Sequence, residues 1–234
     1  DQRPVLNGCY FRVVEDNLLL VSCDSFRLAK CAVSTDMQNI NQAGSPMKFS
    51  FIMPVKTVNE LHRMLTDDEQ EDIRLYMTSK NIMMKLGDLS FFSCLIHGEY
   101  IDYERSIAAN HKLNITLERD ALLSALERAA LITEERIAGA VRSHVKLQVE
   151  GDVLKISARS VAGSTYDEIP VEHEGDDLSI AFYNRYLTDA LRACTADRIK
   201  ISMSSPLSSI HIEPADEVDG DSELFFLLPV RVKE

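Results

Sequence analysis

The stretch AFYNRYLTDAL (residues 181–191) joins a short apolar run to a helical pattern, and FIMPVKTVNEL (51–61) repeats this arrangement. EDNLLLVSCD (15–24) and EGDVLKISAR (150–159) form a second matching pair, and each lies before the first motif in its own half of the chain. The order hairpin, strand, helix, hairpin occurs in both halves. The sequence therefore predicts one structural module that is used twice.

The first half of the chain reads as strands around one helix. Residues 9–33 predict three strands with turns at Glu15–Asn17 and near Asp24–Ser25, and residues 34–46 predict a polar loop. A strand over KFSFIM comes next, and Pro54 opens a helix with apolar residues at helical spacing. The strands that follow are IRLYMTS, NIMMKLG and LSFFSCLIHGEY.

The second half begins with a strand and a helix that the first half does not have. KLNITLE predicts the strand, and residues 119–131 predict the helix. A hairpin over 144–160 turns at Glu150–Asp152, and SIAFY is followed by a helix over NRYLTDALRACT that Asn184 caps. RIKISMSS and SSIHIEP predict another hairpin, and LFFLLPVRV (224–232) predicts the last strand.

Length and composition restrict the class of protein. The 234 residues suffice for two domains, and 45% apolar with 26% charged residues is typical of a folded protein. No run approaches 18 apolar residues, so no membrane contact is expected. The five cysteines are scattered without a CxxC pair, which favours a reducing cytoplasm over a disulfide framework or a zinc site. With a net charge of −12, any contact with nucleic acid must be local.

The first module lacks the strand and helix with which the second module begins. The strand and helix at 113–131 have no counterpart before Arg3, and the chain begins without a methionine or a charged-then-apolar leader. We therefore expect a fragment of a longer protein.

Five motifs are spread over nearly the whole chain: RPVLNG (3–8), CDSFRLA (23–29), GEYIDYER (98–105), LSSIHIEPAD (207–216) and FFLLPVRV (225–232). In these motifs and in their order, the chain resembles the bacterial DNA polymerase III beta subunit, the replicative sliding clamp family. The resemblance implies an α+β fold of repeated clamp modules, with antiparallel sheets outside and paired helices lining a DNA pore. Residues 1–109 would be the middle clamp domain without its N-terminal strand and helix, and residues 110–234 the C-terminal clamp domain. The first clamp domain would be absent.

The same resemblance implies a function without catalysis or cofactors. Family members are processivity factors: two chains form a homodimeric ring that encircles double-stranded DNA without sequence preference. A hydrophobic pocket then tethers the DNA polymerase III alpha subunit, the clamp loader and other proteins that carry a clamp-binding motif ending in Leu and an aromatic residue.

The resemblance also assigns that pocket to particular positions. Carried over one by one, its residues are Leu6, Cys23, Ser25, Phe26, Arg27, Leu28, Ile101, Arg105, Ser106, Ser209, Phe226, Leu227, Leu228, Pro229, Val230, Arg231 and Val232. The alternative is that Leu224, Phe226 and Leu228, which are spaced by two, belong to an ordinary core strand. Pro229 cannot donate to a β-ladder, so the strand should end there or lie at an edge.

Two departures from the family pattern affect the choice of partner. The family usually has Thr-Asp-Gly-His-Arg-Leu at residues 23–28, where this chain has Cys-Asp-Ser-Phe-Arg-Leu, and often has Pro where this chain has Ile101. Phe26 makes the pocket wall larger and more apolar, while Ser25 gives up the conformational freedom of glycine at a tight turn.

The implied pore helices are 54–65, 119–131 and 184–194. Their residues expected to face phosphates are Lys56, Arg63, Arg128, Arg185 and Arg192, with Arg3 in a loop near the pore. Such contacts are nonspecific and salt-sensitive. The alternative is that these are ordinary solvated helix faces.

Leu131 and Ile132 are the apolar contacts that the resemblance implies at the seam between two chains. The alternative is that both residues pack inside their own domain. If the first clamp domain is absent, the seam has no partner and the fragment cannot close the ring.

Enzyme readings find little support in the sequence. The six histidines lack metal-ligand spacing, and the acidic run 67–72 lacks the glycine and spacing of a calcium loop. A hydrolase that uses this run with His62 or His97 is one alternative, and a repeat-built interaction scaffold without a DNA role is another. Cys23 is better explained as a packed thiol than as a nucleophile.

Overall fold

A computed structural model describes residues 3–40, 46–65, 72–107, 111–133, 144–161, 163–216 and 220–231. The chain divides into two compact units. Unit 1 comprises Asp1–Ser25 and Lys30–Tyr103, and unit 2 comprises Phe26–Ala29 and Glu104–Glu234. The four residues Phe26–Ala29, which lie between the two segments of unit 1 in the sequence, therefore belong to the second unit.

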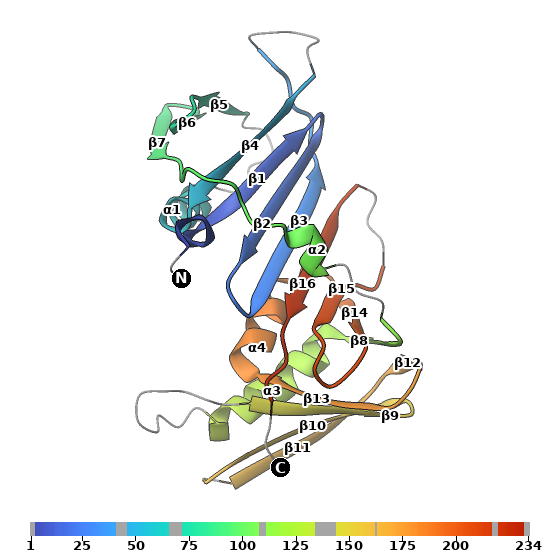
Figure 1. The fold of residues 1–234 in the computed structure, drawn as a ribbon. Helices are drawn as coiled ribbons and strands as arrows, with labels where there is room; N and C mark the ends of the chain where they lie inside the picture. Colours follow the sequence, from blue (N-terminus) through green and yellow to red (C-terminus); the bar gives the residue numbers. More distant parts are fainter. Residues whose placement is uncertain are drawn as a thin grey trace. The chain divides into compact units, whose positions relative to one another are not determined.

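Unit 1 consists of two antiparallel sheets and one longer helix (Figure 1). Its elements are η1 (Pro4–Asn7), β1 (Gly8–Val14), β2 (Asn17–Cys23), β3 (Arg27–Ser34), β4 (Lys48–Pro54), α1 (Val55–Met64), β5 (Ile73–Met77), β6 (Asn81–Leu86) and β7 (Leu89–Cys94). The strands pair in the orders β3-β2-β1-β4 and β5-β6-β7. Phe51, Met53 and Leu61 from β4 and α1 form a core with Ile82 and Met84 of β6.

Unit 2 is larger and contains two sheets with two long helices. Its elements are α2 (Tyr103–Ile107), which begins at the last residue of unit 1, β8 (Leu113–Glu118), α3 (Arg119–Thr133), β9 (His144–Glu150), β10 (Val153–Ser160), β11 (Gly163–Pro170), β12 (Glu172–Glu174), β13 (Leu178–Tyr183), α4 (Asn184–Ala193), β14 (Arg198–Met203), β15 (Ile210–Pro214) and β16 (Ser222–Leu227). One sheet has the order β11-β10-β9-β13. The other has the order β12-β8-β14-β15-β16 and continues to β3, whose residues Arg27–Ala29 belong to this unit.

The two helices α3 and α4 lie side by side in unit 2 (Figure 1). Leu122 and Leu126 of α3 and Leu187 and Leu191 of α4 are fully buried in the same core. The Asn184 side-chain nitrogen donates a hydrogen bond of 2.9 Å to the Leu126 backbone oxygen and so joins the two helices. Apolar residues at helical spacing thus produce a buried face on each helix, as their sequences predict.

The predicted internal repeat is confirmed by the strand pairing. Strands β1, β2, β3 and β4 of unit 1 have the same order as β9, β10, β11 and β13 of unit 2. A helix and three consecutively paired strands follow in each case, α1 with β5–β7 and α4 with β14–β16. In the described part of unit 1, no element corresponds to β8 and α3.

Three details of the sequence predictions are wrong. Asn184 does not cap α4, because its side chain is buried and bonds to α3, and Tyr183 occupies the N-cap position without a side-chain bond. Pro54 is the last residue of β4 and precedes α1 instead of opening it. Strand β16 ends at Leu227, and its buried residues are Phe225 and Leu227, so an ordinary core strand through Leu224, Phe226 and Leu228 is excluded.

Strands β11 and β12 were not predicted. Of the eight residues GSTYDEIP in β11, only Ile169 is buried. A strand with so few apolar residues gives no alternating signal, and it forms because β10 pairs with it along its whole length.

Candidate functional site

The segment that follows β16 is held by two backbone hydrogen bonds inside unit 2. The Leu228 amide donates to the Phe26 oxygen and the Val230 amide donates to the Ala181 oxygen, each at 2.8 Å. Pro229 lies between them and has no amide hydrogen. The chain therefore leaves the sheet after Leu227 and is fixed beside the start of β3 and the middle of β13.

An exposed apolar surface results from this arrangement. Phe26 is 49% exposed and Leu228 is 37% exposed, although each takes part in the backbone bond between them. The Phe26 ring lies 6.2 Å from the Tyr186 ring with an angle of 29° between the planes, and Tyr183 meets Tyr186 edge-on at 5.5 Å. We call Phe26, Tyr186 and Leu228 the aromatic patch.

Arg27 supports the aromatic patch from one side. Its Nη1 donates to the Asp189 Oδ2 at 2.7 Å, and its Cζ lies 4.5 Å from the centre of the Tyr186 ring. Arg185 approaches the same carboxylate at 3.8 Å. A guanidinium that stacks on an aromatic ring while it bonds a carboxylate has a fixed orientation, so Arg27 orders the patch.

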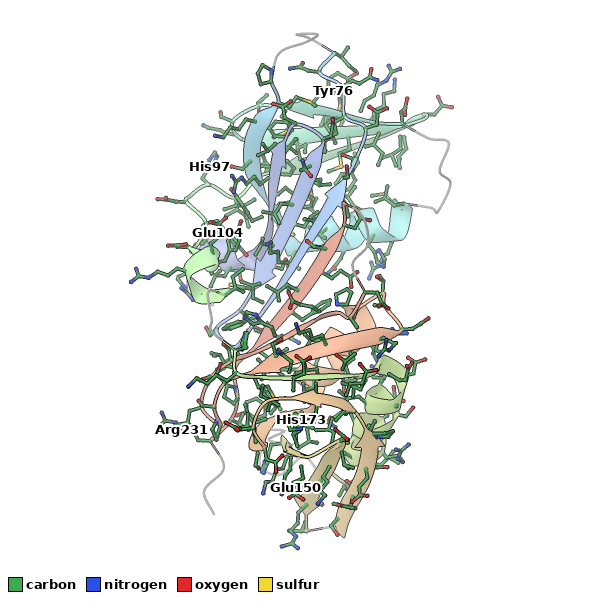
Figure 2. The ribbon with its side chains drawn as sticks, turned by 90° about the vertical axis from the view of Figure 1, so that its right-hand side faces the viewer. Tyr76, His97, Glu104, Glu150, His173 and Arg231 are labelled. Carbon is green, nitrogen blue, oxygen red and sulfur yellow. The ribbon has the colours of Figure 1, made fainter. Side chains whose placement is uncertain are left out.

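The remaining predicted pocket residues of unit 2 range from buried to exposed. Leu28 and Leu227 are buried, and Phe226 is half-buried with its ring 5.9 Å from that of His211. The others in unit 2 are partly or fully exposed: Arg105, Ser106, Ser209, Pro229, Val230 and Arg231. Arg231 points away from the ribbon (Figure 2). Val232 lies outside the described residues.

Four predicted pocket residues belong to unit 1: Leu6, Cys23, Ser25 and Ile101. Leu6 is on η1, Cys23 ends β2, and Ser25 is in the following turn. Burial raises the pKa of the Cys23 thiol, and the nearby charge of Arg3 opposes this effect only in part. A thiol with a raised pKa is protonated at neutral pH, which agrees with the prediction that Cys23 is no nucleophile.

Tyr183, Tyr186 and Asp189 were not among the predicted site residues. All three lie in the strand-to-helix stretch of the second module, where the first module has Met53, Lys56 and Asn59. The replacement of Met and Lys by two tyrosines three positions apart was a signal, because an N-cap residue and the residue three positions later lie close together at the start of a helix. The partner of Asp189 comes from residue 27, and no sequence pattern indicates a contact at that separation.

The basic residues expected to face DNA are mostly paired with acids. Ion pairs join Arg63 to Glu60 at 2.8 Å, Arg128 to Asp167 at 2.5 Å and Arg192 to Glu127 at 2.9 Å, and Arg185 lies 3.8 Å from Asp189. Lys56 is exposed on α1, with no carboxylate within 4.0 Å among the described residues. Arg3 is exposed before η1. The positive charge of the helices is thus largely compensated.

The two expected seam residues differ in environment. Leu131 is 85% exposed, whereas Ile132 is half-buried and packs against the core of unit 2. The alternative that both pack inside their own domain is therefore wrong for Leu131.

The described residues contain no group of three His, Cys, Asp or Glu side chains arranged to hold a metal ion. His62 and His97 are exposed, and the acidic run 67–72 lies outside the described residues except for Asp72. None of the described helices has the length and apolar character needed to cross a membrane.

Repeated units of this topology, with sheets of matching strand order and one or two helices packed on them, define the class of sliding-clamp folds. Family models match the chain as "DNA polymerase III beta subunit, central domain" over residues 1–102 and "DNA polymerase III beta subunit, C-terminal domain" over residues 104–225. The chain belongs to the DNA polymerase III beta subunit family.

Individual proteins of this family are similar to the chain over nearly its whole length. The beta sliding clamp of Staphylococcus aureus strain Mu50 is 28% identical over 233 residues, which are 99% of this chain and 58% of that protein. The sliding clamp structure from Bacillus subtilis has a TM-score of 0.88 at 27% identity over 100% of this chain and 58% of its own. The beta subunit from Pseudomonas aeruginosa has a TM-score of 0.86 at 27% identity, covering 99% of this chain and 60% of its own. The chain thus spans less than two thirds of the relatives it matches.

Proposed function

We propose that this chain is part of a DNA sliding clamp, a non-catalytic processivity factor that holds DNA polymerase III on double-stranded DNA. The observation that carries the proposal is the aromatic patch beside the fixed C-terminal segment, in a chain of the beta subunit family. Its domains would be the middle clamp domain at 1–109 and the C-terminal clamp domain at 110–234.

The aromatic patch is well suited to hold a short linear peptide. Phe26 and Leu228 present apolar area that a peptide's Leu and aromatic side chains can cover, and burial of such area is the main source of affinity at small sites. Arg27 is already engaged by Asp189 and Tyr186, so the surface needs little reordering when a peptide binds. On the family resemblance we also include Arg105, Ser106, Ser209 and Arg231 in the proposed site.

The charge distribution supports a clamp that holds DNA by encircling it and not by binding its phosphates tightly. The chain has a net charge of −12, and the arginines of α3 and α4 are compensated by neighbouring acids. Helices whose charges are compensated in this way do not bind phosphate tightly. We propose that Lys56, Arg63, Arg128, Arg185, Arg192 and Arg3 face the duplex in a closed ring, with Leu131 at the seam between two chains.

The partners that follow are the DNA polymerase III alpha subunit, the clamp loader and other proteins with a clamp-binding motif. All of them act on DNA in the cytoplasm, where we place this protein. The five scattered cysteines, which favour a reducing compartment over a disulfide framework, agree with that location.

The test is a titration of a fluorescent peptide ending in Leu-Phe, followed by anisotropy. We expect saturable binding to the wild-type chain and its loss in the double variant Leu228→Ala, Pro229→Ala. Leu207→Ala is the matched control, because Leu207 is 64% exposed on a different loop of unit 2. If the double variant binds as well as wild type does, the C-terminal segment is not the site.

A further inference from the structure

Strand β5 of unit 1 lies at the edge of its sheet. It is the first strand in the order β5-β6-β7, and no other described strand pairs with it (Figure 1). All of its residues, Ile73–Met77, are exposed. Natural proteins usually protect such an edge, because its outward amide and carbonyl groups can pair with a further strand. The edge of β5 is therefore a candidate interaction surface.

The outward backbone groups of β5 belong to alternate residues. At the turn between β5 and β6, the Thr78 amide donates to the Asn81 oxygen at 2.9 Å. Hydrogen-bonded pairs alternate along an antiparallel ladder, so the backbones of Tyr76 and Arg74 also bond to β6. The residues whose amides and carbonyls point away from β6 are Ile73, Leu75 and Met77.

The same alternate residues carry apolar side chains that the core does not cover. Leu75 is the cross-strand neighbour of Met84, and Met77 is the neighbour of Ile82. Both neighbours are buried in the core of unit 1, so this is the core face of the sheet. Nevertheless, Ile73 is 46% exposed, Leu75 is 43% exposed and Met77 is 36% exposed.

The second module shows what such an edge looks like when a strand lies beside it. IRLYM (73–77) in β5 corresponds to IKISM (199–203) in β14, and β14 pairs with β8. There Ile199, Ile201 and Met203 are fully buried. An antiparallel strand beside β5 would therefore cover its apolar residues in the same way.

The sequence of β5 is complementary to itself in one antiparallel register. When Leu75 lies opposite Leu75 of a second copy, Ile73 of each copy lies opposite Met77 of the other. These are the residues with outward backbone groups, so each amide meets a carbonyl. Their apolar side chains all lie on the core face and cover one another.

The other face of β5 is complementary in the same register. Arg74 lies opposite Tyr76 of the second copy, and Tyr76 (Figure 2) is 46% exposed. Inside the sheet the neighbour of Arg74 is Lys85, a like charge, so its guanidinium is better placed over a ring across the edge. A register centred on Arg74 would instead set two arginines against each other, and one centred on Tyr76 would leave Ile73 without a partner.

We propose that β5 pairs with β5 of a second copy of this chain about a two-fold axis at Leu75, so that two three-stranded sheets join into one. The exposed parts of Ile73, Leu75, Tyr76 and Met77 amount to roughly 300 Å² in each copy. Both copies together bury less than the about 1,200 Å² of a standard interface, so we expect a weak dimer with a Kd of about 10–100 µM. This interface uses neither the aromatic patch nor Leu131.

Sedimentation equilibrium of the 234-residue chain, over about 1 to 300 µM, measures this dimer. In Leu75→Lys two lysines meet at the two-fold axis, and Kd should rise at least about 10-fold. Leu89→Lys is the matched control and should leave Kd unchanged. Leu89 is 46% exposed on β7, at the opposite edge of the same sheet.

Cross-linking tests the register. The background is Cys94→Ser, which removes an exposed thiol of unit 1. Leu75→Cys should give a disulfide-linked dimer when oxidised glutathione is added, because opposite residues of a hydrogen-bonded pair have Cα atoms about 5.5 Å apart. Ile73→Cys should give none, because the two thiols are offset by about 13 Å along the strands.

Four results would overturn the proposal. The first is a wild-type chain that stays monomeric over the whole range, and if it then binds a synthetic KLNITLE peptide (112–118), the edge accepts a strand of another protein. The second is an equal loss of dimer in Leu75→Lys and Leu89→Lys. The third is a dimer that survives Leu75→Lys, and its loss in Leu131→Lys would place it at the seam between clamp chains. The fourth is cross-linking of Ile73→Cys in place of Leu75→Cys.

Discussion

The change Phe26→Ala tests the aromatic patch most directly. Phe26 is 49% exposed, and a phenylalanine presents roughly 200 Å², so about 100 Å² is available to a bound peptide. At about 25 cal/mol per Å², covering this area is worth about 2.5 kcal/mol. Because alanine keeps one methyl group, we expect a loss of about 2 kcal/mol, or about 30-fold in Kd.

The assay is anisotropy with the peptide ending in Leu-Phe, and thermal unfolding checks the fold. Phe92→Ala is the matched control, because Phe92 is 70% exposed on β7 and lies outside the site. It should leave Kd unchanged, and neither variant should shift Tm by more than a few degrees. Phe26→His, which restores the residue usual in the family, should retain intermediate affinity. A Phe26→Ala chain that binds within twofold of wild type would refute the assignment of the patch.

Two further predictions concern the helices of the modules. Asn184→Ala should lower the free energy of unfolding by about 1.5 kcal/mol, because the hydrogen bond to Leu126 is lost inside the core. Urea unfolding measures this, and an unchanged midpoint concentration would contradict the prediction. Lys56→Gln should weaken DNA binding at low salt more than Arg128→Gln does, because Asp167 already neutralises Arg128. Electrophoretic mobility shifts measure the difference, and equal losses would argue that the ion pair opens on DNA.

The repeated module was predictable because its pattern is local. Apolar alternation in a strand and helical spacing in the next ten residues depend only on neighbours in sequence, and two copies support each other. The missed strand β11 shows the limit of this reasoning. Its residues Tyr166 and Glu168 are polar or exposed, and its pairing with β10 supplies the structure that its own pattern does not indicate.

The site was predictable only in outline. Pro229 indicated where the last strand ends, since a residue without an amide hydrogen cannot continue a ladder. The alternative of a core strand assigned the wrong alternate residues of β16 to the core. The cause is that all four residues Leu224–Leu227 are apolar, so the sequence does not say which two of them face the core. Asn184 shows the same problem at a helix start, where a tertiary bond to α3 replaced the local cap.

The two backbone hydrogen bonds that hold Leu228 and Val230 have a practical consequence for labelling or immobilising this protein. The last described residue, Arg231, follows directly after the amide that bonds to Ala181. A polypeptide fused behind Glu234 is therefore attached only six residues after Leu228 of the aromatic patch and can compete with a bound peptide for the same space. Affinity handles, dyes and surface tethers belong at the other end of the chain, or on the exposed thiol of Cys94.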